Sequence, residues 1–232
     1  MVDFAQFEAS LALLKERVES ACAACGRDAG EVAILPVTKN HPADAARFAL
    51  AAGLGRAGEN RVQEAEEKVP AVPGLEWELI GHLQANKARR AAGLFSRIQS
   101  VDSLRLASRL DAAAGELGKR LRILLQINSG RDPAKFGADI EDAPALLEGA
   151  LSLPNLSVEG LMTVAPIDST LDAASRAFAA LREIRDGLSS SFGVPLPELS
   201  MGMSGDLERA VAEGSTMVRV GTFLFGERDY AK

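Results

Sequence analysis

The strongest constraint on the fold is an alternation that runs along nearly the whole chain. Short runs of aliphatic and β-branched residues are separated by longer stretches rich in Ala, Leu, Glu and Arg. This alternation is typical of βαβ units, in which helices connect parallel strands. The predicted strands cover residues 32–38, 55–58, 76–81, 97–101, 121–128, 157–163, 197–201 and 217–221. The predicted helices between them cover residues 42–52, 60–69, 84–93, 103–118, 139–152, 170–191 and 205–213.

A further amphipathic helix is predicted ahead of the first strand, over residues 3–26, and Gly26 ends it. Its apolar residues recur at helical spacing and form one stripe: Phe4, Phe7, Leu11, Leu14, Val18 and Ala21. No low-complexity linker divides the 232 residues, a length that α/β barrels often occupy as one domain. We therefore expect an α/β fold, a single (β/α)₈ TIM barrel with an extra N-terminal helix. The expected domain spans 1–232, with the leading helix in 1–28 and the barrel in 30–230; a doubly wound open sheet is the alternative.

Prolines mark several expected boundaries. Pro42 is predicted to open a helix, and Pro70 and Pro73 to bracket a loop. Pro36 removes a backbone donor inside the first strand and predicts a local bulge there.

Composition excludes several classes of function. The 26 basic and 32 acidic residues give a net charge of −6, which would repel a nucleic-acid backbone. No uncharged apolar stretch is long enough to cross a membrane, and the N-terminal residues lack the pattern of a signal peptide. Cys22 and Cys25 cannot form the disulfide framework of a secreted protein. We therefore expect a cytoplasmic protein without nucleic-acid or membrane partners.

Three short motifs match known patterns only in part. Gly53–Gly58 matches G-x-G-x-x-G, but a predicted helix precedes it where a dinucleotide site needs a strand, so Gly53 is interpreted as a helix C-cap. Cys22 and Cys25 match C-x-x-C inside the leading helix, where they do not complete a zinc site, and no metal site is predicted. Gly202–Asp206 is not a nucleophile elbow, because Asp206 stands where glycine is needed.

Functional groups of a barrel gather where the strands end. Lys39 follows the first strand and is either a solvated strand end or an amine held over the barrel mouth. Ser204 is placed as the N-cap of the following helix, and Gly221 and Thr222 follow the eighth strand, so these residues either bind phosphate or simply cap and turn. Arg219, within the eighth strand, should be buried and needs a carboxylate or a ligand as its partner. An amine, a phosphate cradle and an arginine together suggest pyridoxal 5′-phosphate (PLP) as the cofactor.

The sequence resembles the PLP homeostasis proteins, single-domain relatives of the alanine racemase N-terminal barrel. The resemblance spans roughly residues 30–230 and is carried by five motifs in order: Val37–Lys39, Gly58–Glu64, Ile80–Lys87, Leu199–Ser204 and Val218–Gly226. The cofactor-binding residues that it implies are Lys39, Asn60, His82, Met203, Ser204, Arg219, Gly221 and Thr222.

The resemblance also implies a role for each of the main site residues. Lys39 would carry PLP as a Schiff base, and Ser204, Gly221 and Thr222 would hold its phosphate. Arg219 would face the pyridine nitrogen, and Asn60 and His82 would line the same mouth. The implied function is intracellular PLP homeostasis, with PLP as the ligand and PLP-dependent apoenzymes as candidate recipients.

A racemase on this barrel needs a second acid or base on the opposite face of the cofactor, and the resembling racemases supply it as a tyrosine from an additional domain. The chain has one tyrosine, Tyr230, in its last residues, and no length is left for such a domain. An arginine facing the ring nitrogen would also weaken the electron sink. We therefore favour a PLP-binding protein without robust catalysis. The alternatives are a low-activity PLP-dependent racemase or lyase, and a cofactor-free Schiff-base aldolase.

Overall fold

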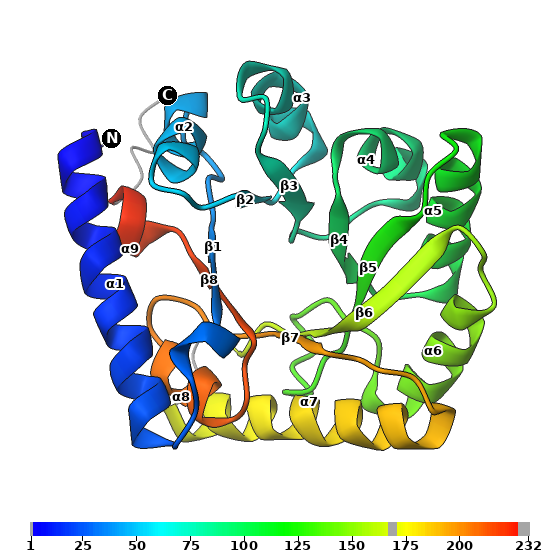
Figure 1. Ribbon diagram of the computed structural model, residues 1–232. Coiled ribbons are helices and arrows are strands. Elements are labelled where there is room, and N and C mark those ends of the chain that lie inside the picture. Colours follow the sequence, from blue (N-terminus) through cyan, green and yellow to red (C-terminus); the bar gives the residue numbers. More distant parts are fainter. Residues whose placement is uncertain (1, 167–170, 227–232) are drawn as a thin grey trace.

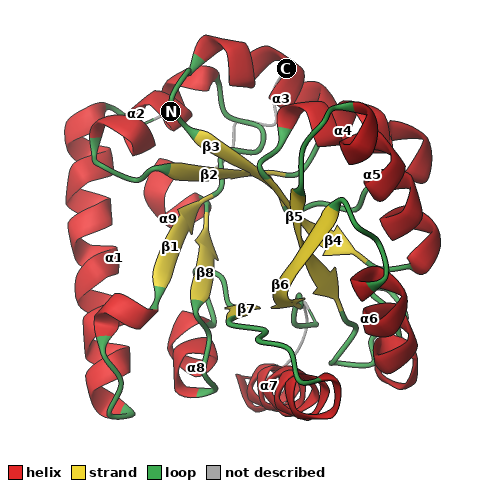
Figure 2. Cartoon of the chain, turned by 45° about the vertical axis from the view of Figure 1, so that its right-hand side comes forward, coloured by secondary structure: helices red, strands yellow, loops and turns green. Residues whose placement is uncertain are grey.

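The computed structural model describes residues 2–166 and 171–226 and has eight parallel strands arranged as a barrel, with helices around it (Figures 1 and 2). The predicted TIM barrel is therefore confirmed. Each strand lies where the alternation placed it, with ends that move by at most two residues. The strands are β1 Ala33–Pro36, β2 Arg56–Glu59, β3 Glu76–Leu79, β4 Arg97–Val101, β5 Leu121–Gln126, β6 Leu156–Met162, β7 Glu198–Ser200 and β8 Met217–Val220.

The strands follow the order β1-β8-β7-β6-β5-β4-β3-β2, and a parallel bridge between Val37 and Gly58 joins the two ends of this order. Pro36 is the reason why that junction is so short. The amides of Ala33 and Val37 donate toward β8 and that of Thr38 toward β2, so an amide at position 36 would also point to β2. Pro36 has no such amide, and the β1–β8 register runs unbroken from Ala33 to Pro36. The predicted bulge at Pro36 is therefore wrong.

The helices include every predicted one. They are α1 Phe4–Ala24, α2 Ala43–Ala51, α3 Val62–Ala71, α4 Ala88–Leu94, α5 Leu104–Glu116, α6 Ala143–Leu151, α7 Leu171–Phe192, α8 Leu207–Ala212 and α9 Thr222–Phe225, with short 3₁₀ turns at Ala29–Glu31, Ala85–Lys87 and Ile140–Asp142. α9 was not predicted, because four residues are too few for a helical period to be seen. Pro70 lies inside the last turn of α3 instead of starting a loop.

The glycine-rich segment after α2 begins with the glycine that ends this helix. Gly53 has φ +81°, and its amide donates to the carbonyl of Leu50. β2 begins only at Arg56, after the helix has ended. Gly53 therefore terminates a helix, as predicted, because glycine adopts the left-handed conformation without steric strain.

The leading helix α1 packs along the outside of the barrel, against α8 and α9 (Figure 1). The predicted apolar stripe makes this contact: Phe7, Leu11, Leu14 and Val18 are buried in a cluster with Val218 and Val220 of β8, while Phe4 is partly buried. Asp3 caps the helix by accepting from the amide of Gln6. None of the helices that the structure describes is both long and apolar enough to cross a membrane.

Candidate functional site

A cavity of about 200 Å³ opens at the carboxyl ends of the strands. Six predicted site residues line it, namely Lys39, Met203, Ser204, Arg219, Gly221 and Thr222, and Val37, Ile80 and Gly205 complete the wall. Among these nine lining residues, which all lie in the described part of the chain, none is acidic, two are cationic and two carry hydroxyl groups. This donor set fits an anionic ligand that also carries a group reactive toward an amine, as PLP does.

Asn60 and His82 lie at the same end of the barrel but are not among the residues that line the cavity. The backbone of Asn60 packs on Gly81, where an added Cβ would lie 2.2 Å from the Asn60 carbonyl oxygen. His82 Nδ1 lies 3.3 Å from Asp102 Oδ2, and the imidazole stacks on Phe136 with 3.9 Å between ring centroids. The part that Asn60 and His82 take in cofactor binding stays a prediction.

Lys39 is half-buried and sits in a tight turn directly after β1. The amides of Val37 and Thr38 bond to β8 and β2, and the amide of His41 donates to the carbonyl of Thr38 at 3.0 Å. Asn40 has φ +60°, a left-handed conformation that asparagine tolerates better than most residues. The turn therefore holds the backbone of Lys39 between two strands, while its side chain lines the cavity.

Arg219 is 4% exposed, so the prediction of a buried arginine is confirmed. Its guanidinium donates to Ser200 Oγ at 2.8 Å and to the carbonyl of Thr163 at 2.7 Å. Ser200 Oγ in turn donates to Gln99 Oε1 at 2.6 Å, and Gln99 Nε2 donates to Glu78 Oε2 at 2.6 Å. A chain of hydrogen bonds through the barrel interior thus fixes the position of Arg219.

The charge of Arg219 is affected by the same burial. Desolvation lowers the pKa of Arg219 to about 10, and the carboxylate of Asp206 opposes this change. The side chain therefore remains protonated near neutral pH and acts as a donor toward the cavity.

The segment after β7 differs from its prediction. α8 begins at Leu207 with Asp206 as the N-cap residue, so the prediction of Ser204 as the N-cap is wrong. The reason is a tight turn ahead of the helix, in which Asp206 Oδ1 accepts from the Met203 amide at 2.6 Å and the Asp206 amide donates to the Met203 carbonyl. Ser204 lies in this turn and lines the cavity.

Gly221 allows two strand ends to approach each other. A Cβ at Gly221 would lie 3.1 Å from the carbonyl oxygen of Val37, closer than most real contacts. The Gly221 carbonyl accepts from the amides of Leu224 and Phe225, which starts α9 at Thr222. Gly221 and Thr222 are thereby brought against the turn that carries Lys39.

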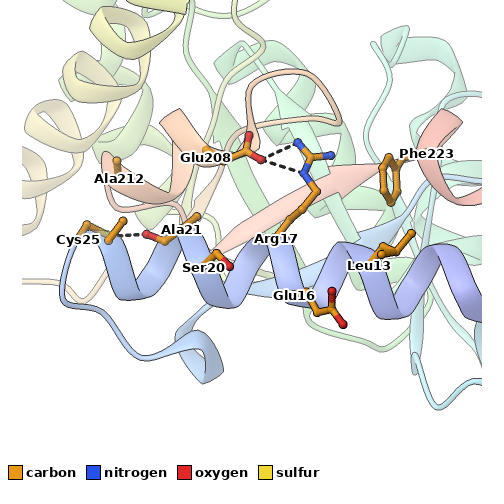
Figure 3. A pocket seen from close by; sticks show the side chains of 10 residues that line it. Leu13, Glu16, Arg17, Ser20, Ala21, Cys25, Glu208, Ala212 and Phe223 are labelled. Carbon is orange, nitrogen blue, oxygen red and sulfur yellow. Dashed lines mark hydrogen bonds and ion pairs between the residues drawn. The ribbon is translucent and has the colours of Figure 1, made fainter.

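A larger cavity, of about 690 Å³, lies outside the barrel between α1 and α8 (Figure 3). Arg17 crosses it, pairs with Glu208 at 2.7 Å and donates to the carbonyl of Ser204 at 3.2 Å. The guanidinium also lies over the ring of Phe223. This groove contains none of the predicted site residues, so the cavity at the strand ends is the better candidate for a functional site.

Sequence reasoning missed the residues that support Arg219 from behind. Gln99 and Ser200 lie on β4 and β7, and every residue of β4 is buried. Strands of a parallel barrel are covered on both faces, so a glutamine inside one of them needs a buried partner. The sequence places Gln99 inside a predicted strand, so a buried partner could have been expected. It did not indicate which strand carried that partner.

Comparisons with known proteins agree with the geometry. A family profile described as alanine racemase, N-terminal domain, matches residues 9–229. A Pseudomonas aeruginosa protein named pyridoxal phosphate homeostasis protein is 43% identical over 223 residues, which cover 95% of each chain. The structure of PipY from Synechococcus elongatus with PLP bound is 43% identical, has a TM-score of 0.80 and covers 91% of this chain and 99% of that chain.

An alanine racemase from Clostridium difficile has the same fold at 18% identity, with a TM-score of 0.76, and the match covers 98% of this chain and 57% of the racemase. In contrast, the match to PipY extends over nearly the full length of both chains. With the family profile and the identity to the Pseudomonas aeruginosa protein, these matches show that the chain belongs to the pyridoxal phosphate homeostasis protein family, which has the alanine racemase N-terminal fold.

Proposed function

We propose that this chain binds PLP in the cavity at the strand ends and serves PLP homeostasis, by storing or delivering the cofactor and affecting the balance of amino acids and keto acids. The observation that carries the proposal is the convergence of Lys39, Arg219, Ser204 and Thr222 on one cavity without an acidic lining residue. The relatives at 43% identity, one named for PLP homeostasis and one with PLP bound, support it.

Five of the lining residues have a proposed part. PLP supplies an aldehyde that reacts with amines and a pyridine ring that withdraws electrons. Lys39 Nζ is proposed to add to the aldehyde carbon, so that a C=N bond replaces the C=O bond and the oxygen leaves as water. Ser204, Gly221 and Thr222 are proposed to hold the phosphate through hydroxyl and backbone donors.

Arg219 is proposed to lie toward the pyridine nitrogen. As a protonated guanidinium it donates a hydrogen bond but does not give up its proton readily, so the ring nitrogen would stay unprotonated. An unprotonated ring withdraws electrons less strongly, which favours binding of the cofactor over robust amino-acid chemistry. A racemase would also need a second acid or base, such as a tyrosine. Tyr230 is the one tyrosine of the sequence, and it lies outside the described residues.

The test is to load purified protein with PLP, reduce it with borohydride and map the modified peptide by mass spectrometry. We expect a pyridoxyl group on Lys39 and loss of the visible absorption band in Lys39→Ala. Lys15→Ala, an exposed change on α1, is the control and should retain both. A lysine that traps only an added carbonyl substrate would favour the aldolase instead. Racemisation of amino acids at ordinary enzyme turnover would contradict the binding-protein proposal.

Delivery to PLP-dependent apoenzymes is a finer proposal. It predicts that the loaded protein restores activity to an apoenzyme even when free PLP is removed by a competing scavenger. We also propose that the protein acts in the cytoplasm, because Cys22 and Cys25 are both free thiols. A net charge of −6 gives no reason to expect nucleic acid among its partners.

A further inference from the structure

A cluster of three charged side chains, two of them buried and the third partly exposed, lies directly behind Lys39. Glu59, on β2, is fully buried, and Lys68, on α3, is 6% exposed. Lys68 Nζ lies 2.5 Å from Glu59 Oε1 and 3.4 Å from Glu64 Oε2. Burial raises the pKa of Glu59, and the ammonium group of Lys68 beside it opposes that rise. Both glutamates belong to the motif Gly58–Glu64, and the resemblance implies no role for either.

The polar contacts of this cluster end on the backbone to either side of Lys39. Lys68 Nζ donates to the carbonyl of Thr38 at 2.8 Å, and Thr38 Oγ1 donates to Glu59 Oε1 at 2.6 Å. The Asn40 amide donates to Glu64 Oε2 at 2.7 Å. The residue before Lys39 and the residue after it are therefore both anchored to the same charged cluster.

Stability of the fold does not by itself require charges at these positions. Replacing a buried ion pair by apolar residues of similar volume is often neutral or stabilising, since both charges must otherwise be desolvated. Apolar side chains, however, could not anchor a carbonyl and an amide in fixed directions. Asn40 is also held at φ +60°, a conformation that asparagine tolerates better than most residues other than glycine.

We propose that Glu59, Lys68 and Glu64 are positioning residues, which aim Lys39 at the aldehyde carbon of the cofactor by fixing the turn around it. The inference rests on the proposed function, in which Lys39 forms the covalent link to PLP. Displacement of a reacting group by about 1 Å can reduce a rate by about a hundredfold. A loosened turn should therefore slow formation of the adduct, and this effect should exceed what the change in the unfolding midpoint would explain.

The experiment compares Lys68→Met with Lys119→Met in protein freed of PLP. Lys119 is half-buried and, like Lys68, donates to a backbone carbonyl, that of Phe95 at 3.2 Å. It lies at the amino end of β5, away from the cavity. PLP is added, and the rate at which the visible band of the lysine adduct appears is followed by stopped-flow absorbance. The pH titration of that band and the unfolding midpoint are measured for each variant.

We expect Lys68→Met to slow adduct formation by about tenfold or more and to shift the pH titration of the band, with Lys119→Met at the wild-type rate. Glu64→Ala is the second variant in case Lys68→Met does not fold, because Glu64 is partly exposed and its loss frees the amide of Asn40. Adduct formation and a pH titration like those of wild type in both folded variants would overturn the inference and leave the proposed function intact. Absence of any adduct on Lys39 in the wild type would instead contradict the proposed function.

Discussion

The ion pair between Arg97 and Glu78 allows a quantitative test of how the barrel interior is held together. Arg97 is 1% exposed and Glu78 is fully buried, and two hydrogen bonds of 2.8 and 3.0 Å join the guanidinium to both carboxylate oxygens. Glu78 also accepts the hydrogen bond from Gln99 that begins the chain of contacts to Arg219. The pair therefore contributes both to the fold and to the proposed cofactor site.

Arg97→Met removes the cation and leaves the carboxylate of Glu78 in the barrel interior. The remaining donors to Glu78 are Gln99 Nε2 at 2.6 Å and the partly exposed Arg56 at 3.5 Å. Breaking a buried pair in this way costs about 3–5 kcal/mol of unfolding free energy. For a chain of this size the melting temperature should fall by about 6–20 °C.

The double variant Arg97→Met/Glu78→Met separates loss of the pair from loss of packing. It should be less destabilised than Arg97→Met, because no fully buried carboxylate is left without its cation. In Glu78→Met alone, Arg97 keeps Glu159 at 3.0 Å and Glu198 at 3.4 Å. The control is Glu76→Gln, which breaks the exposed pair between Glu76 and Arg122 and should cost at most about 1 kcal/mol. Urea and thermal unfolding followed by circular dichroism measure wild type and four variants: Arg97→Met, Glu78→Met, the double variant and Glu76→Gln. An Arg97→Met variant that costs less than about 1 kcal/mol, or a double variant that costs the sum of the two single variants, would refute this reasoning.

Three further predictions follow from individual contacts. Gly81→Ala should destabilise the protein by about 3 kcal/mol or more in urea unfolding, because its Cβ would lie 2.2 Å from the backbone of Asn60; Gly93→Ala in α4, with open space around it, should be neutral or stabilising. The hydrogen bond from Arg122 lowers the pKa of Glu76. The stability advantage of wild type over Glu76→Gln should therefore be present at neutral pH and be lost as the pH falls through the folded-state pKa of Glu76. Arg219→Lys should weaken PLP binding by about tenfold or more in absorbance titrations, because lysine lacks the planar fork that bridges two buried acceptors; unchanged affinity would contradict the assigned role.

The barrel could be predicted because its signal is local. Each strand and helix is marked by its own run of residues, so β4 was placed at residues 97–101 without knowledge of its neighbours. The candidate site was predictable for the same reason, since the C-terminal strand ends of a barrel meet at one mouth. By this rule Lys39 and Gly221 were expected at the same mouth although they lie far apart in the sequence, and both line the cavity.

Details that depend on particular side-chain contacts could not be predicted. Serine is a favourable N-cap residue, which is why Ser204 was expected to cap the helix. The carboxylate of Asp206 instead accepts a hydrogen bond from the Met203 amide, and α8 begins later, at Leu207. Likewise, the bond between Gln99 and Ser200 joins residues 101 positions apart, and no local pattern pairs them. Which side chains enter a cavity depends on such contacts more than on the position of a strand end.

The partners of the buried cations explain how a chain of net charge −6 could hold an anion. In the part of the chain that the structure describes, three lysine or arginine side chains are buried: Lys68, Arg97 and Arg219. Lys68 and Arg97 form ion pairs with carboxylates, so their charges are neutralised within the fold. Arg219 instead donates to a hydroxyl group and a carbonyl, and desolvation lowers its pKa. A cation that is desolvated but bonded to neutral acceptors gains most from an anionic ligand, and Arg219 is the one that lines the cavity.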